Sequence, residues 1–218
     1  MADIPRRESL TAFDAAFSSE CVARVVGKDT LAAADAAKGP AEVLPAEAGV
    51  AEAVLAVAEH GCVRLAGSGR VVDRVTMDSM VFRAWLFGVL TFLEIRAREL
   101  IASDPAWREL MSRARLEKAR AIKDERARRG RSMETLDALQ FGDVGWLAVR
   151  YDGWYEYFGV RSKKKAKLLV KQLETLRNAL AHSQDILSHD WETVVAVARS
   201  VVAIKEAETA ARIASTGS

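Results

Sequence analysis

The sequence predicts a mainly α-helical protein in which a small N-terminal α/β unit precedes an all-α helical bundle. Three observations lead to this fold class. The 218 residues are 50% hydrophobic and 28% charged, a composition typical of folded proteins. Two short β-branched runs, at 62–66 and 70–76, are typical of strands. After Asp78, apolar residues recur at helical spacing and no strand pattern returns. We therefore expect two domains, 1–80 and 81–218.

The N-terminal unit is expected to contain one helix and a β-hairpin. Apolar residues recur at helical spacing over 50–59, and His60-Gly61 is typical of a helix end. Gly67-Ser68-Gly69 separates the two strand-like runs, as the turn of a hairpin would. Residues 1–48 are rich in Ala, and their pattern is too weak for an element to be assigned.

The C-terminal domain is expected to consist of helices. They are predicted at 79–102, 105–130, 133–139, 163–183 and from 191 onward, with a frayed tail at 214–218. Asp104 and Pro105 suit the N-cap and the first position of the second of these helices. Ser162 suits the N-cap of the fourth, and either Ser188 or Asp190 suits the N-cap of the last.

Several classes of protein are excluded by composition. The charged N-terminus is followed by no apolar run of the length that a signal peptide needs, so we expect a cytoplasmic protein. No apolar stretch approaches the roughly 20 residues that span a bilayer, so we expect no membrane partner. Cys21 and Cys62 lack CxxC spacing and the three His residues lie far apart, so neither a metal site nor a cofactor is predicted.

The formal net charge of +2 conceals an uneven distribution. Residues 1–80 carry a net charge of −4 and residues 81–218 a net charge of +6. Within 108–131 there are ten Lys and Arg and four Asp and Glu, which suits either RNA or a solvated face with i,i+4 pairs such as Arg113 with Glu117. A second cluster is predicted to bind RNA phosphates because it adjoins the candidate site. Its members are Lys163, Lys164, Lys165 and Lys167.

An aromatic segment runs from 146 to 158. Its members are Trp146, Tyr151, Trp154, Tyr155, Tyr157 and Phe158. Such residues can stack on unpaired bases, but packing in the core is the commoner use and is the one we expect.

The most informative segment lies at the end of the fourth predicted helix, where polar residues interrupt an amphipathic pattern. Asn178 and His182 are one helical turn apart, whereas Arg177 and His182 diverge by about 140° on an ideal helix. Imidazole exchanges protons near neutral pH, an amide can hold one imidazole tautomer, and guanidinium grips phosphate bidentately. Together the three side chains suit cleavage of a phosphodiester without a metal.

A structural role for the same residues stands beside this interpretation. Arg177 lies three residues after Glu174 and could pair with it. His182 lies near a helix end, where it could cap the last carbonyl groups.

The run from Arg177 to His182 resembles the R-x4-H motif of the HEPN superfamily in its common form, Arg-Asn-x-x-Ala-His. The surroundings also resemble a bacterial HEPN group. The matching segments are an early helix with Phe82, Trp85, Leu93 and Glu94, followed by 139–143, 158–164 and 184–187. The resemblance covers about residues 81–205.

HEPN domains are helical bundles that usually dimerise with two motif helices facing each other, and many are metal-independent ribonucleases in toxin, antiphage or RNA-processing systems. The resemblance implies a homodimer in which Arg177 and His182 of both copies form one cleft. His182 would act as general base or acid, Arg177 would stabilise charge on the phosphorane, and Asn178 would position His182 or the phosphate. It also implies RNA as substrate, because the 2′-hydroxyl is the nucleophile, and an antitoxin or inhibitor protein as a further partner.

The N-terminal segment from about 49 to 80 resembles a single CBS repeat, a module that often binds adenine nucleotides in pairs. It departs from the usual pattern twice: Asp73 replaces a Gly, and Asp78 follows Thr76 by two residues instead of three. If the unit binds a nucleotide, Thr76 and Asp78 are the candidate residues. A purely structural or dimerising role is the alternative.

For the whole chain, the alternative to a metal-independent endoribonuclease is a non-catalytic regulatory module. In that case the HEPN-like bundle would mediate dimerisation or would bind RNA or a protein partner, and the N-terminal unit could sense a nucleotide.

Overall fold

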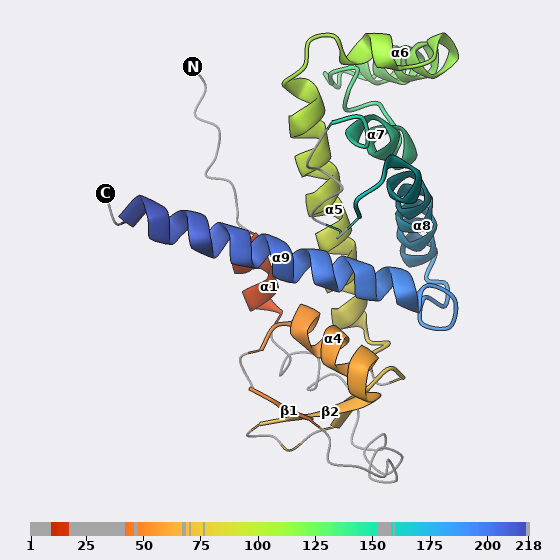
Figure 1. The fold of residues 1–218 in the computed structure, drawn as a ribbon. Coiled ribbons are helices and arrows are strands. Elements are labelled where there is room, and N and C mark those ends of the chain that lie inside the picture. The colour runs from red at the N-terminus through yellow and green to blue at the C-terminus, as the bar shows by residue number, and fades with distance from the viewer. Residues whose placement is uncertain are drawn as a thin grey trace. The chain divides into compact units, whose positions relative to one another are not determined.

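The computed structural model describes residues 10–17, 42–45, 48–66, 69, 71–75, 77–151, 158 and 160–216 (Figure 1). The described part is mainly helical and contains a small three-stranded sheet. The chain divides into two compact units. Unit 1 comprises residues 1–89 and 179–218, and unit 2 comprises residues 90–178. This division differs from the single boundary expected at residue 80, because the C-terminal helix packs with the N-terminal α/β elements.

The sheet of unit 1 has the strand order β1-β2-β3. Strands β2 (Cys62–Leu65) and β3 (Val71–Asp73) are antiparallel, with Val63 opposite Val72, so the predicted hairpin is confirmed. Strand β1 (Glu42–Leu44) pairs in parallel with β2 and was not predicted. A three-residue strand carries almost no periodic signal of its own, and its backbone groups are satisfied only by a partner about twenty residues away.

The helices of unit 1 cover this sheet and close its core. Helix α4 (Val50–His60) ends at Gly61, whose φ of 81° is readily accessible only to glycine, as predicted from the sequence. It packs against the sheet and against α9 (Trp191–Thr216), which also contacts α1 (Leu10–Ala16). Small and β-branched side chains of α4, such as Ala53 and Val54, are buried and allow this close approach.

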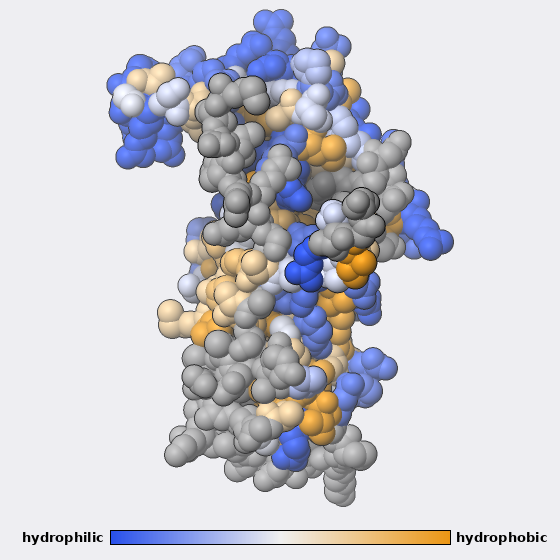
Figure 2. All heavy atoms as spheres, turned by 90° about the vertical axis from the view of Figure 1, so that its left-hand side faces the viewer, coloured by the Kyte–Doolittle hydropathy of each residue, from blue (hydrophilic) through white to orange (hydrophobic). Residues whose placement is uncertain are grey.

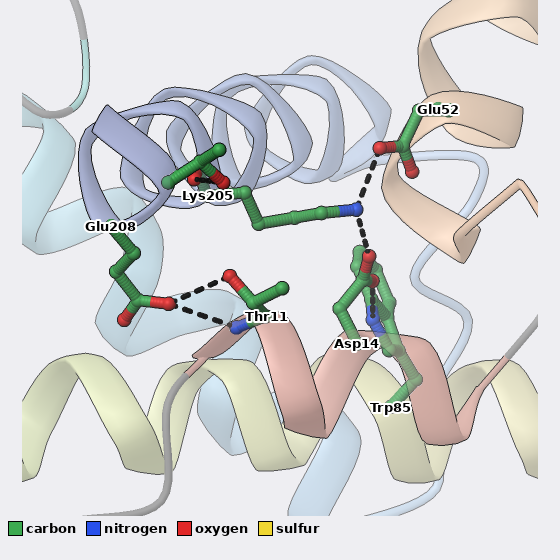
Figure 3. Close-up of polar contacts among 7 residues, drawn as sticks. Thr11, Asp14, Glu52, Trp85, Lys205 and Glu208 are labelled. Atoms are coloured by element: carbon green, nitrogen blue, oxygen red, sulfur yellow. Dashed lines mark hydrogen bonds and ion pairs between the residues drawn. The ribbon is translucent and has the colours of Figure 1, made fainter. Parts of the chain in front are cut away.

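A polar network joins α1, α4 and α9 with the first part of α5 inside unit 1 (Figure 3). The buried carboxylate of Asp14 accepts hydrogen bonds from Trp85 Nε1 at 2.9 Å and from Lys205 Nζ at 2.6 Å. Lys205 also bonds Glu52 Oε1 at 2.7 Å. Glu208 of α9 accepts bonds from the backbone N–H groups of Leu10 and Thr11, which satisfies two free donors at the start of α1.

The described residues of unit 2 form five helical segments. Helix α5 (Met80–Ala102) begins in unit 1 and ends in unit 2, followed by the 3₁₀ turn η2 (Trp107–Leu110), α6 (Arg113–Arg128), α7 (Phe141–Ala148) and α8 (Lys163–Ala181). Buried apolar side chains on α5, α7 and α8 supply its core. They include Leu93, Ile101, Val144, Leu147, Val170 and Leu173.

Helices α7 and α8 approach each other closely because two glycines face α8. A Cβ atom at Gly145 would lie 2.6 Å from a methyl group of Val170, and one at Gly142 would lie 2.6 Å from the carboxylate of Glu174. A larger residue at Gly145 would push the helices apart, whereas one at Gly142 would require the Glu174 carboxylate to move. The carboxylate of Glu174 therefore lies against α7.

Three sequence predictions for the helices were wrong. The helix expected at 105–130 is interrupted at Met111 and Ser112, because a 3₁₀ turn precedes α6. The expected helix at 133–139 is a run of turns whose carbonyls at 136 and 139 accept hydrogen bonds from Arg98. Helix α9 continues to Thr216 instead of fraying at 214.

Candidate functional site

The motif residues lie at the end of α8, a helix whose sequence explains both its formation and its orientation. Ser162 caps it by accepting a hydrogen bond from the backbone N–H of Lys165 at 3.3 Å, as predicted. Its buried face repeats at helical spacing, and the side chains of Lys163 to Lys165 are exposed on its first turn. The buried members are Ala166, Leu169, Val170, Leu173 and Leu176. Arg177 and Asn178 follow in the last turn.

The end of α8 is defined by a specific backbone arrangement. The N–H of Ser183 donates to the carbonyl of Leu180 at 3.2 Å, and the N–H of Gln184 donates to the carbonyl of Ala179 at 2.8 Å. This pair of bonds is a Schellman motif, which requires a left-handed residue immediately after the cap. Ser183 takes that conformation with φ of 54°, and it is the only non-glycine residue with positive φ in the described part of the chain. His182 is thereby held directly beyond the last residue of α8.

The loop after the motif is anchored to the start of α5. Arg83 Nη1 donates to the carbonyl oxygen of Gln184 at 2.9 Å. The same guanidinium is held by the two carboxylate oxygens of Asp78, at 2.7 and 3.2 Å. Bidentate pairs of this kind constrain orientation as well as distance. Arg83 therefore links Asp78 to Gln184, which is about one hundred positions away in the sequence, and fixes the backbone next to His182.

The remainder of this loop is also ordered by its own polar groups. Asp185 Oδ1 accepts hydrogen bonds from the backbone N–H groups of Leu187 and Ser188, at 3.0 and 3.1 Å. Bonds from Ser188 hold the pKa of the Asp185 carboxyl below its ordinary value. Ile186 and Leu187 are buried. A loop with buried side chains and bonded backbone gives His182 a firm support.

The three motif side chains themselves are available to a ligand. His182 and Asn178 are exposed and Arg177 is half-buried. Their side chains make no hydrogen bond or ion pair with one another or with any other residue that the structure describes. In particular, the alternative pairing of Arg177 with Glu174 is not formed among the described residues. The boundary between units 1 and 2 falls between Asn178 and Ala179, within the motif.

The predicted RNA-binding lysines lie on α8. Lys163, Lys164, Lys165 and Lys167 are exposed. The Nζ atom of Lys167 lies 5.2 Å from the centre of the Trp146 ring, a cation–π distance. Unit 2 carries 20 Lys and Arg against 13 Asp and Glu, a net charge of +7, and unit 1 carries 12 against 17, a net charge of −5. Hydrophilic side chains gather over α6, at the top of Figure 2. The predicted pair of Arg113 with Glu117 is present there at 2.8 Å.

The two nucleotide-binding candidates of the N-terminal unit have different outcomes. Thr76 lies outside the described residues. Both carboxylate oxygens of Asp78 are engaged by Arg83, so this side chain supports the loop after the motif.

The aromatic segment is only partly a core element. Phe158 is buried and Tyr151 is half-buried, where its hydroxyl donates to Asp104 at 2.8 Å. Trp146 is 42% exposed, so core packing is the wrong prediction for this residue. Trp154, Tyr155 and Tyr157 lie outside the described residues.

Sequence reasoning missed Arg83 and the surroundings of Trp146. Arg83 interrupts the apolar first turns of α5, a signal that could have marked it as a residue with a specific partner. The partner itself could not be read from the sequence, because Gln184 is 101 positions away.

Among the residues described, no three His, Cys, Asp or Glu side chains are grouped so that they could hold a metal ion. None of the helices in the described segments is long and apolar enough to cross a membrane. Comparison of the chain with protein-family models, with curated proteins and with solved structures finds no match.

Proposed function

We propose that the chain is a metal-independent endoribonuclease of HEPN type that acts as a homodimer. The observation that carries the proposal is the state of the motif at the end of α8: Arg177, Asn178 and His182 are unbonded among the described residues, while the backbone around them is tightly fixed. Rigid backbone with free polar side chains is what a preorganised site needs. In a merely structural cluster the same side chains would bond to the protein.

The proposed chemistry uses the RNA 2′-hydroxyl as nucleophile. His182 of one copy accepts the proton of the 2′-hydroxyl, whose oxygen attacks the adjacent phosphorus. The bond to the 5′-oxygen breaks, and the partner subunit's His182 donates a proton to that leaving oxygen. The products are a 2′,3′-cyclic phosphate and a free 5′-hydroxyl. Arg177 stabilises the additional negative charge on the phosphorane.

The proposal includes the finer fold assignment. Residues 81–205 are proposed to form an HEPN-like helical bundle and residues 49–80 a CBS-like unit. The bonded state of Asp78 favours a structural role for the CBS-like unit over nucleotide sensing. A thermal-shift measurement with ATP, ADP and AMP tests this point, because a nucleotide at 100 times its Kd would stabilise the protein by about 2.7 kcal/mol.

The decisive experiment compares wild type with His182→Ala on several RNA types in excess EDTA. We expect wild type to cleave RNA and His182→Ala to be slower by about 10² to 10⁴-fold, the usual contribution of a general acid or base. His189→Ala is the matched control, because His189 is another exposed histidine seven residues away and outside the motif.

The proposal fails if wild type and His182→Ala cleave equally, or if wild type cleaves none of the RNAs. Absence of cleavage together with RNA binding would instead support the non-catalytic regulatory module.

A further inference from the structure

A hollow of about 230 Å³ lies in unit 2, apart from the motif residues. It is formed where η2 gives way to α6 and where both face α7. Its lining residues are Leu110, Met111, Ser112, Arg115, Asp143, Trp146, Leu147 and Arg150. Pockets that enclose a whole small molecule usually measure about 300–1,000 Å³. This hollow is smaller and open, so it suits one group of a larger ligand.

Helix α7 presents an exposed indole to this hollow. Val144 and Ala148 are buried and attach the opposite face of α7 to the core of unit 2. Trp146 is nevertheless 42% exposed. A large aromatic side chain held in solvent by a well-packed helix is a ready stacking surface, because each base of a nucleic acid has a π-face.

Basic groups surround this indole. Arg115 forms an ion pair with Asp143, which neutralises the carboxylate of the hollow. The Arg150 side chain is exposed and bonds no residue in the described segments, and its guanidinium can bind an anion bidentately. The ammonium group of Lys167 lies over the Trp146 ring. Ser112, a neutral polar residue, also lines the hollow.

We propose that this hollow binds one nucleotide of single-stranded RNA. The base stacks on Trp146, and the adjacent phosphate is bound by Arg150 with Lys167 beside it. An aromatic ring next to exposed cations matches the chemistry of an unpaired nucleotide, whereas a duplex would hide its base faces. The proposal rests on RNA being the substrate of the chain, and it adds a binding site outside the motif.

The test measures binding of a fluorescent single-stranded oligoadenylate whose riboses carry 2′-O-methyl groups. Methylation blocks the proposed nucleophile, so wild type can be titrated without cleavage. We expect Trp146→Ala to weaken binding about 5- to 150-fold, as the loss of one stacked base does. Trp146→Phe should retain most of the affinity because it keeps a π-face. Arg150→Gln should weaken binding and lower the slope of log K against log salt by about 0.7.

Two variants serve as matched controls. Leu168→Ala removes an exposed apolar side chain of α8, and Arg113→Gln removes an exposed charge of α6; neither residue lines the hollow. Thermal unfolding of each variant checks that it is folded. Three further ligands define the occupant: an abasic oligomer of equal length, a duplex, and free AMP.

The proposal is supported if folded Trp146→Ala loses affinity for the single strand but the control variants do not. It also requires that the abasic oligomer binds wild type no more tightly than it binds Trp146→Ala. Equal affinities of wild type and Trp146→Ala for the normal oligomer would overturn the proposal. An equal loss of affinity for the abasic and the normal oligomer in Trp146→Ala would also overturn it. Selective loss of AMP binding would also overturn it by assigning the hollow to free nucleotides. The binding test does not measure cleavage. If wild type cleaves no RNA but Trp146→Ala still loses affinity for the single strand, the proposed ribonuclease function is refuted and the proposed binding site is not.

Discussion

Ser183 is in an unusual conformation for its residue type. A left-handed backbone costs a non-glycine L-residue roughly 1–2 kcal/mol, yet the Schellman motif at the end of α8 demands it. Strain of this kind tends to occur at functional sites. Here it lies immediately beside the proposed general base.

We expect Ser183→Gly to unfold at the same or slightly higher urea concentration than wild type, because glycine tolerates positive φ. Ser183→Val should lose about 1–2 kcal/mol of unfolding free energy, since a β-branched side chain is poorly accommodated there. Urea titration followed by circular dichroism measures both. Equal stability of Ser183→Val and Ser183→Gly would show that the left-handed turn does not persist in solution.

Arg83 is the second residue with a specific local role, because it joins Asp78 to the carbonyl of Gln184. Replacing Arg83 by Lys keeps the positive charge but removes the planar guanidinium group that makes three hydrogen bonds at once. We expect Arg83→Lys to speed hydrogen exchange of the Ser183 and Gln184 amides and to lower kcat more than it changes KM. Thermal unfolding should shift only slightly, because this ion pair is partly exposed.

Arg64→Lys is a suitable control for Arg83→Lys, since Arg64 bonds a carbonyl in a different part of unit 1. Arg64→Lys should leave the hydrogen exchange of the Ser183 and Gln184 amides unchanged. If Arg83→Lys also left it unchanged, Arg83 would not be the anchor of the motif loop.

Among the helices and strands, those with strong periodicity were predictable and those that depend on distant partners were not. Helices α4, α5 and α8 have apolar residues at regular helical spacing, and the sequence placed them within a residue or two. Strand β1 was missed because its three residues are stabilised by pairing with β2. The break before α6 was missed because the apolar spacing continues across Met111 and Ser112 while the backbone does not.

The same distinction applies to the candidate site. Arg177, Asn178 and His182 lie within six residues and could be identified locally. The anchoring contact from Arg83 and the hollow around Trp146 depend on tertiary structure, so no local pattern contained them.

One lysine of α9, Lys205, lies between two carboxylates, Asp14 of α1 and Glu52 of α4. Burial lowers the pKa of Lys205, but its bonds to Asp14 and Glu52 outweigh burial and raise that pKa above its ordinary value of 10.5. A raised pKa means that the folded state holds the proton more tightly than the unfolded state. The contribution of Lys205 to stability is therefore complete below pH 10.5 and is lost as the pH rises through the folded value.

We expect Lys205→Met to lose about 3–5 kcal/mol of unfolding free energy at neutral pH, because it leaves the buried carboxylate of Asp14 without its cation. The difference from wild type should shrink at strongly alkaline pH. Denaturant titrations across pH measure both effects. Arg199→Met, an exposed change on the same helix, should cost far less.

Adding Asp14→Asn to Lys205→Met should restore part of the stability, since no buried charge then remains unpaired. A loss below about 1 kcal/mol in Lys205→Met would place the network among ordinary exposed pairs and contradict this account.

At the scale of the whole molecule, the charge of the two units is opposite in sign. Unit 2 at +7 carries the lysines proposed to bind RNA and the hollow around Trp146, while unit 1 at −5 carries His182. Phosphate contacts by such a basic unit would give an affinity for RNA that falls steeply with salt. The near-neutral total of +2 therefore does not oppose RNA binding.

The proposed homodimer predicts that activity depends on protein concentration. We expect cleavage per chain to rise as the protein is concentrated and to level off when sedimentation shows a dimer, because each cleft needs His182 from two copies. Constant activity per chain over a range in which sedimentation shows only monomer would exclude a shared cleft.

The division of the chain has a consequence for how the protein is made. Unit 2 is one continuous stretch, whereas unit 1 is completed only by residues 179–218. On the ribosome, residues 90–178 emerge before residues 179–218 and can fold while α9 has not yet been synthesised. Arg177 and Asn178 belong to this early part, and His182 and its supporting turn belong to the late part. A nascent chain would therefore lack the complete proposed site until residues 179–218 have been synthesised, which would protect the transcript being translated from a ribonuclease of the proposed type.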